Sequence, residues 1–68
     1  MSSTLVKYAE AAEYYGNKAA SEYDFKHAAK AYKDAASYWE AAKNLDKAQQ
    51  ARLMSKAYAG LIGSIHRA

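Results

Sequence analysis

The sequence predicts an all-α protein, an antiparallel three-helix bundle in a single domain. In three successive stretches, apolar residues recur at spacings of three and four, which is the period of one helix face, and no stretch alternates with period two. Two short breaks separate these stretches, and both contain Asp or Asn, residue types that cap helices. A chain of 68 residues with such short connections is expected to form one small bundle of antiparallel neighbours.

The first helix is predicted over about residues 4–21. Its apolar face consists of small residues and tyrosines: Leu5, Tyr8, Ala9, Ala12, Tyr15, Gly16 and Ala19. We therefore assign Tyr8 and Tyr15 to the core. Tyr14 falls on the opposite face, where the periodicity leaves a large ring outside.

The second helix is predicted over about residues 24–43, after a break in which Ser21 and Asp24 are candidate caps. Its apolar face is the most regular of the three: Phe25, Ala28, Ala29, Tyr32, Ala35, Ala36, Trp39 and Ala42. Phe25, Tyr32 and Trp39 are its expected core residues, and Tyr38 lies off this face.

The third helix is predicted over about residues 47–65, because Asp46 and Gln49 have the spacing of a capping box. Its apolar face runs through Ala51, Met54, Tyr58, Leu61 and Ile65. Met54, Tyr58 and Leu61 are assigned to the core, whereas Leu53 lies off the face. Gly60 and Gly63 each cost about 1 kcal/mol relative to Ala, so the last turn is expected to fray or bend.

The composition indicates that aromatic rings fill the core. Large aliphatic residues are few, whereas the chain has seven Tyr, one Trp and one Phe, and Ala is its commonest residue. Aromatic rings bury large areas, and Ala on the facing helix leaves space for them.

Several classes of protein are excluded or disfavoured by composition. The chain has no Cys, which removes disulfides, thiol nucleophiles and thiolate metal sites. The longest apolar or glycine stretch, residues 57–63, is far shorter than the ~20 residues of a membrane-spanning helix. The first residues lack the pattern of a secretory signal. We therefore expect a cytoplasmic protein with no membrane partner.

No pattern indicates catalysis, a metal or a cofactor. His27 and His66 have no His or Cys at helical spacing, so we expect His27 to be a partly exposed helix residue. Glu10 and Glu13 share a helix face, but no nucleophile or phosphate-binding loop accompanies them, and a solvated surface is the favoured interpretation. We expect a protein that is not an enzyme.

Part of the chain resembles one tetratricopeptide (TPR) repeat. The resemblance covers residues 12–40 and rests on Tyr15-Gly16, Asp24-Phe25, Ala28, Tyr32 and Ala35. Ala12, Ala19 and Glu40 stand where the repeat has Trp, Tyr and Pro. A helical hairpin followed by one more helix is also similar to an MIT domain, with Tyr58 where the third helix of that family often has Tyr. This resemblance implies a module that binds peptides in grooves between its helices.

The residues off the three apolar faces are the predicted partner-binding residues. Three of them have large apolar side chains, which a solvated surface does not require: Tyr14, Tyr38 and Leu53. The other two, Arg52 and Lys56, are basic residues one turn apart on the third helix. The sequence therefore predicts a non-enzymatic protein–protein interaction module, a small helical adaptor or regulator. Its expected partner is a helical segment of another protein or a second copy in a homodimer.

A small basic nucleic-acid-binding regulator is the alternative function. The net charge is +3, and the line of Arg52, Lys56 and Arg67 could follow a phosphate backbone. Phosphate binding would weaken steeply with salt, whereas an apolar groove would be nearly indifferent to it.

Overall fold

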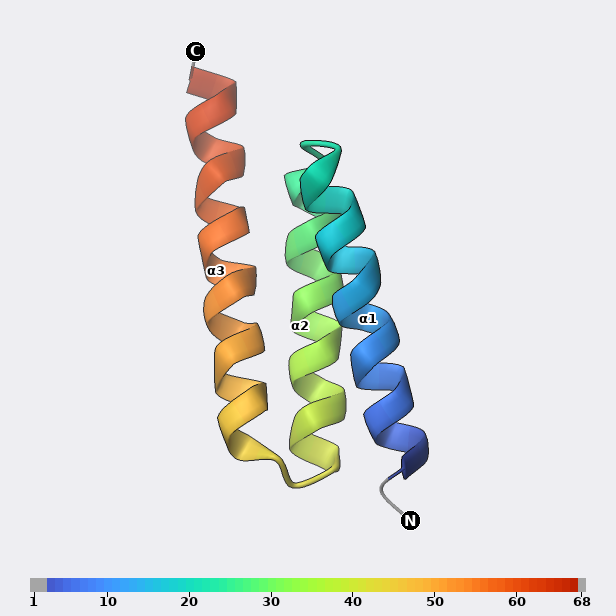
Figure 1. The fold of residues 1–68 in the computed structure, drawn as a ribbon. Coiled ribbons are helices and arrows are strands. Elements are labelled where there is room, and N and C mark those ends of the chain that lie inside the picture. Colours follow the sequence, from blue (N-terminus) through green and yellow to red (C-terminus); the bar gives the residue numbers. More distant parts are fainter. Residues whose placement is uncertain (1–2, 68) are drawn as a thin grey trace.

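The chain folds into three antiparallel α-helices (Figure 1). The computed structural model describes the backbone of residues 3–67 and the side chains of residues 3–62. The helices are α1 (Ser3–Ser21), α2 (Phe25–Ala41) and α3 (Leu45–Arg67), and residues 3–67 include no strand. The predicted all-α three-helix bundle is confirmed.

The first turn both closes α1 and opens α2. Tyr23 has a φ of 61°, and the Asp24 amide donates to the Ala19 carbonyl at 2.8 Å. This is a Schellman arrangement, which satisfies carbonyls at the end of a helix. The Asp24 side chain then accepts a hydrogen bond from the His27 amide at 3.3 Å and caps α2.

The second turn repeats this geometry between α2 and α3. Lys43 has a φ of 66°, and the Asn44 amide donates to the Trp39 carbonyl at 2.9 Å. Asn44 Oδ1 accepts from the Lys47 amide at 3.2 Å. The cap of α3 is therefore Asn44, and the predicted capping role of Asp46 is wrong, because the helix begins earlier and Asp46 lies in its first turn.

The left-handed backbone at Lys43 leads to a stability prediction. A left-handed conformation strains a residue that has a Cβ atom, and Gly adopts it freely. Lys43→Gly is expected to stabilise the protein by a few tenths to about 1 kcal/mol, measured by urea unfolding. Lys33→Gly, in the middle of α2, is the control and should destabilise it by about 1 kcal/mol. Equal losses in both variants would contradict the prediction.

The bundle is open, with α2 in the middle. Both α1 and α3 pack along α2, and they hardly touch each other. The Cα atoms extend over 46 × 18 × 11 Å, which is wider and flatter than a closed triangle of helices about 8–10 Å apart. Figure 1 also shows that the end of α3 rises beyond the turn between α1 and α2. Each outer helix therefore buries only one side.

The core lies along α2, as the regularity of that helix predicts. Tyr32 and Trp39 are buried there among small residues of all three helices. The buried residues of this cluster are Ala9, Tyr32, Ala35, Ala36, Trp39, Ala48 and Ala51. Alanines on the facing helices bring the backbones close, so two rings from α2 fill most of the interior.

The assignment of Tyr8 and Tyr15 to the core is wrong. The two side chains are 54% and 63% exposed, whereas Ala9 and Gly16, their neighbours in sequence, are buried. Successive residues on a helix differ by about 100°, so Tyr8 and Tyr15 lie at the edge of the face centred on Ala9 and Gly16. In the described part of the chain, α2 meets that edge of α1 through the Tyr8–Tyr38 ring contact, and α3 lies on the other side of α2.

The apolar face of α3 is rotated from the predicted one. Met54 and Leu61 are exposed, contrary to their assignment to the core. Ser55 faces α2 instead, and its hydroxyl donates to the Ala29 carbonyl at 2.8 Å. This contact lets α3 pack through small residues, which leaves the longer side chains at its edge.

Phe25 and Tyr58 take an intermediate position. Both are half-buried, and their rings stack with centroids 5.8 Å apart. They join α2 to α3 beside Tyr32, whose ring also stacks on Tyr58. Ile65, which the sequence places on the apolar face of the third helix, lies outside the described side chains.

Candidate docking groove

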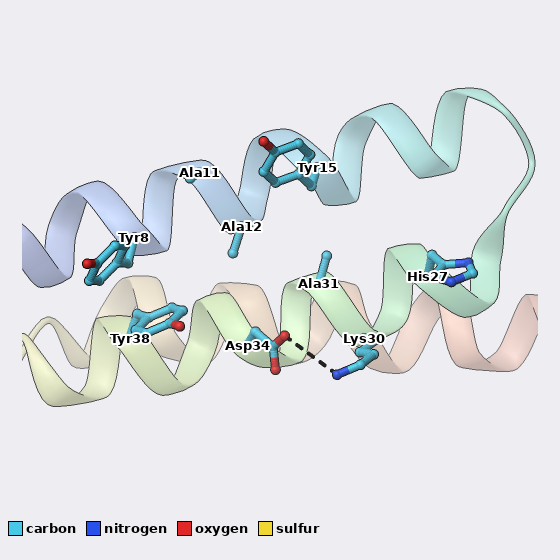
Figure 2. A pocket seen from close by; sticks show the side chains of 9 residues that line it. All are labelled: Tyr8, Ala11, Ala12, Tyr15, His27, Lys30, Ala31, Asp34 and Tyr38. Atoms are coloured by element: carbon cyan, nitrogen blue, oxygen red, sulfur yellow. Dashed lines mark ion pairs between the residues drawn. The ribbon is translucent and has the colours of Figure 1, made fainter.

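A groove of about 410 Å³ runs between α1 and α2. Figure 2 shows the side chains that line it, three tyrosines and three alanines with a few polar residues. The lining residues are Tyr8, Ala11, Ala12, Tyr15, His27, Lys30, Ala31, Asp34 and Tyr38. They recur at spacings of three and four on each helix, so one face of α1 and one face of α2 form the two walls.

Aromatic rings close one end of the groove. The rings of Tyr8 on α1 and Tyr38 on α2 are 5.5 Å apart at an angle of 41°, within the range of favourable aromatic pairs. Farther along α1 the Tyr15 ring lies between Tyr8 and the end of the groove at His27 (Figure 2). It also meets the Tyr14 ring edge-on, with centroids 5.6 Å apart. The Tyr8–Tyr38 pair joins the two helices and remains open to solvent on its outer side.

Small side chains keep the middle of the groove open. Ala12 and Ala31 are half-buried and point toward each other across it (Figure 2). Neither reaches far enough to fill the space between the tyrosines. An apolar recess bounded by aromatic rings is the usual form of a binding pocket for an apolar side chain.

One ion pair lies on the α2 rim of the groove. Lys30 Nζ and Asp34 Oδ2 are 3.9 Å apart, and the two side chains are 74% and 54% exposed. Exposed pairs of this length contribute little to stability. The pair therefore leaves both ions able to contact a bound partner.

A second polar pair lies where α2 begins. His27 Nδ1 and Asp24 Oδ2 are 2.7 Å apart, and the hydrogen bonds from the His27 side chain and amide hold the pKa of the Asp24 carboxyl below its ordinary value. His27 is exposed, as its sequence position predicts. Its ring lines the groove at the end where α2 begins (Figure 2).

The structure places one predicted partner-binding residue in the groove and one outside it. Tyr38 lines the groove, whereas Tyr14 is exposed on α1 beyond the lining residues. Tyr14 touches the groove only indirectly, through its ring contact with Tyr15.

The other three predicted partner-binding residues lie on α3, away from the groove. Leu53 and Lys56 are exposed there. Arg52 donates to Glu40 Oε2 at 2.5 Å and thereby ties α3 to α2. Since α1 and α3 flank α2 on different sides, these five residues do not form one surface.

Of the nine residues that line the groove, only Tyr38 was predicted to bind a partner. Tyr8 and Tyr15 were assigned to the core, and Ala11 and Ala31 carried no signal of their own. Positions on a helical wheel would have indicated that the rings of Tyr8 and Tyr15 are exposed, because both residues lie about 100–120° from the buried centre of α1. Ala11 and Ala31 line the groove only because α1 and α2 lie side by side in the folded protein.

Glu13 is not the solvated surface residue that was expected. It is half-buried, and its Oε2 accepts a hydrogen bond from Trp39 Nε1 at 2.9 Å. Glu13 therefore orients the largest core ring. Glu10, its suggested catalytic companion, is exposed.

The described part of the chain offers neither a metal-binding cluster nor a membrane-spanning helix. Residues 3–62 contain no cluster of three or more His, Asp or Glu side chains placed to bind a metal ion. No helix within the described range combines the length and apolarity needed to cross a membrane. His66 and Arg67 lie outside the described side chains.

Comparison with protein-family models, with curated proteins and with solved structures finds no match for this chain.

Proposed function

We propose that this chain is a non-enzymatic protein–protein interaction module whose groove between α1 and α2 receives an α-helix. The observation that carries the proposal is the groove itself, about 410 Å³ in volume and lined by Tyr8, Tyr15 and Tyr38 around small alanines. The predicted resemblance to a TPR hairpin and an MIT domain points to the same class of function.

The chemistry of the lining suits a helix better than a small polar ligand. A helix presents apolar side chains at positions i, i+3, i+4 and i+7, and such anchors enter a groove between two other helices. Tyrosine supplies a large apolar surface with a hydroxyl that reaches solvent, which is why it is enriched where proteins meet. The two half-exposed rings of Tyr8 and Tyr15 would be covered by such a partner.

The nucleic-acid alternative has less support. Its key cation, Arg52, is engaged by Glu40, and Lys47 Nζ lies over the Trp39 ring, 4.7 Å from its centroid. Basic groups that hold the bundle together are less available for phosphates. A protein-binding groove also predicts weak dependence on salt, whereas phosphate binding predicts a steep one.

Selection from a library of displayed helical peptides tests the proposal. Ala11→Glu places a charge on an exposed position of the groove wall, and Ala57→Glu makes the same change at an exposed position on α3. Peptides selected on the unaltered protein should carry apolar anchors one helical turn apart. Their affinity should fall about tenfold or more, ~1.4 kcal/mol, on Ala11→Glu and stay unchanged on Ala57→Glu.

Circular dichroism should show the same helix content for the unaltered chain and both variants. The proposal would be wrong if no peptide were selected on the monomeric protein, or if selected peptides bound the two variants equally well. Retention on Ala11→Glu combined with loss on Ala57→Glu would move the binding surface to α3.

A further inference from the structure

The charges on the rim of the groove suggest what occupies it. Lys30 and Asp34 are one turn apart on α2, and their weak contact of 3.9 Å leaves both largely exposed. Because this rim carries one positive and one negative side chain, its net charge is zero. A partner of uniform charge would attract one of them and repel the other.

A second copy of the same chain matches both charges at once. Four residues span about 6 Å along a helix, so a two-fold axis through the midpoint of Lys30 and Asp34 places each residue opposite the other type on the second copy. In such an isologous contact every pair occurs twice. The two helices α2 then run antiparallel, and each copy supplies the charge that the other needs.

The same two-fold axis also makes the shape of the groove complementary to that of a second copy. One end is bulky, with the Tyr8–Tyr38 pair, and the centre is small, with Ala12 and Ala31 (Figure 2). The two-fold axis turns the bulky end of one copy toward the opposite end of the other. The alanines between them let the two helix pairs approach closely.

Such a contact would cover a modest share of the surface of each copy. A standard interface takes ~800 Å² from each partner, roughly a sixth of the 4953 Å² of this chain. Tyr8 and Tyr15, 54% and 63% exposed, together with Ala11 and Tyr38, provide a continuous apolar strip for it. Covering this strip would give α1 the second neighbour that the open bundle lacks.

We infer that the occupant of the groove is a second copy of this chain, in a two-fold dimer held by reciprocal Lys30–Asp34 pairs. This inference rests on the proposed function of the groove and names its partner. The dimer is a four-helix arrangement of two α1–α2 pairs, with α3 on the outside of each copy.

Charge exchange between two variants tests the inference. Lys30→Glu alone sets Glu against Asp34 of the second copy, and Asp34→Lys alone sets Lys against Lys30 of the second copy. Each variant alone should dimerise at least about tenfold more weakly than the unaltered protein, because like charges are juxtaposed. An equal mixture should form a heterodimer with an affinity close to that of the unaltered dimer.

Sedimentation velocity over a concentration series, with native mass spectrometry to identify the heterodimer, measures these affinities. Lys33→Glu is the matched control, since it makes the same charge change on an exposed part of α2 outside the groove and should dimerise normally. Each variant carries two like charges at positions 30 and 34 of its own α2. Recovery of dimerisation in the mixture can therefore arise only from pairing between the two variants.

The inference is overturned if the unaltered protein stays monomeric at about 100 µM, if either single variant dimerises normally, or if the mixture shows no recovery. A monomer that still binds helical peptides in a manner sensitive to Ala11→Glu would remove the dimer and retain the groove as a docking site. A monomer that binds no peptide would remove both.

Discussion

Trp39→Ala should remove most of the free energy of unfolding of the protein. The Trp39 side chain is only 2% exposed and lies among alanines of all three helices. Truncating a buried aromatic ring to Ala costs about 3–5 kcal/mol, and a domain of this size has a total stability near the lower end of about 5–15 kcal/mol. The change also leaves the half-buried Glu13 carboxylate without its donor.

Circular dichroism during urea unfolding measures this loss. Tyr14→Ala removes an exposed ring from α1 and is the control, with an expected change of at most about 0.5 kcal/mol. Trp39→Phe should fall between the two, since it keeps an apolar ring and removes the Nε1 donor. A Trp39→Ala variant that unfolds cooperatively at nearly the same urea concentration as the parent would show that this ring does not organise the core.

Gly16→Ala is expected to destabilise the protein although Ala favours helices. A Cβ atom at Gly16 would lie 2.7 Å from both Cδ2 and Cε2 of Tyr32. The Tyr32 ring has little freedom to withdraw, because it is buried, stacks on Tyr58 and donates a hydrogen bond to Asn17. Overpacking of this kind costs about 1–3 kcal/mol, more than the ~1 kcal/mol that Ala contributes to a helix.

Gly60→Ala is the matched control for this steric effect. It is the same substitution in α3, where the new Cβ would meet no described atom within 4 Å other than its chain neighbours and the backbone of its own helix. It should stabilise the protein by up to about 1 kcal/mol, so the two variants should shift the urea midpoint in opposite directions. Two stabilising shifts of similar size would contradict the close contact between α1 and the Tyr32 ring.

The helices could be predicted from the sequence because their signals are local. Periodic apolar residues and a capping Asp24 suffice to place α2, and its large rings, Tyr32 and Trp39, are spaced so that only one face can bury both. The start of α3 was misplaced, because Asn44 and Asp46 are both good caps. The hydrogen bond from the Lys47 amide to Asn44 Oδ1, a property of the folded turn, decides between them.

The candidate site could be predicted only in part, since it depends on how many neighbours each helix has. A closed bundle would cover Tyr8, Tyr15, Met54 and Leu61, whereas in the open one α1 and α3 each pack mainly against α2. Alanine-rich faces also define a helix orientation weakly, because several neighbouring angles bury similar areas. In α3 the hydrogen bond from Ser55 to α2 favours one of these angles. The spacing of apolar residues in the sequence does not indicate this hydrogen bond.

Intermolecular nuclear Overhauser effects in a mixture of ¹³C-labelled and unlabelled protein show which side chains meet a bound copy. The groove between α1 and α2 predicts contacts from the methyl groups of Ala11 and Ala31 to tyrosine rings of the other molecule. Contacts that instead originate from Leu53 and Ala57 on α3, in a sample shown to be dimeric, would contradict the groove as the interaction surface.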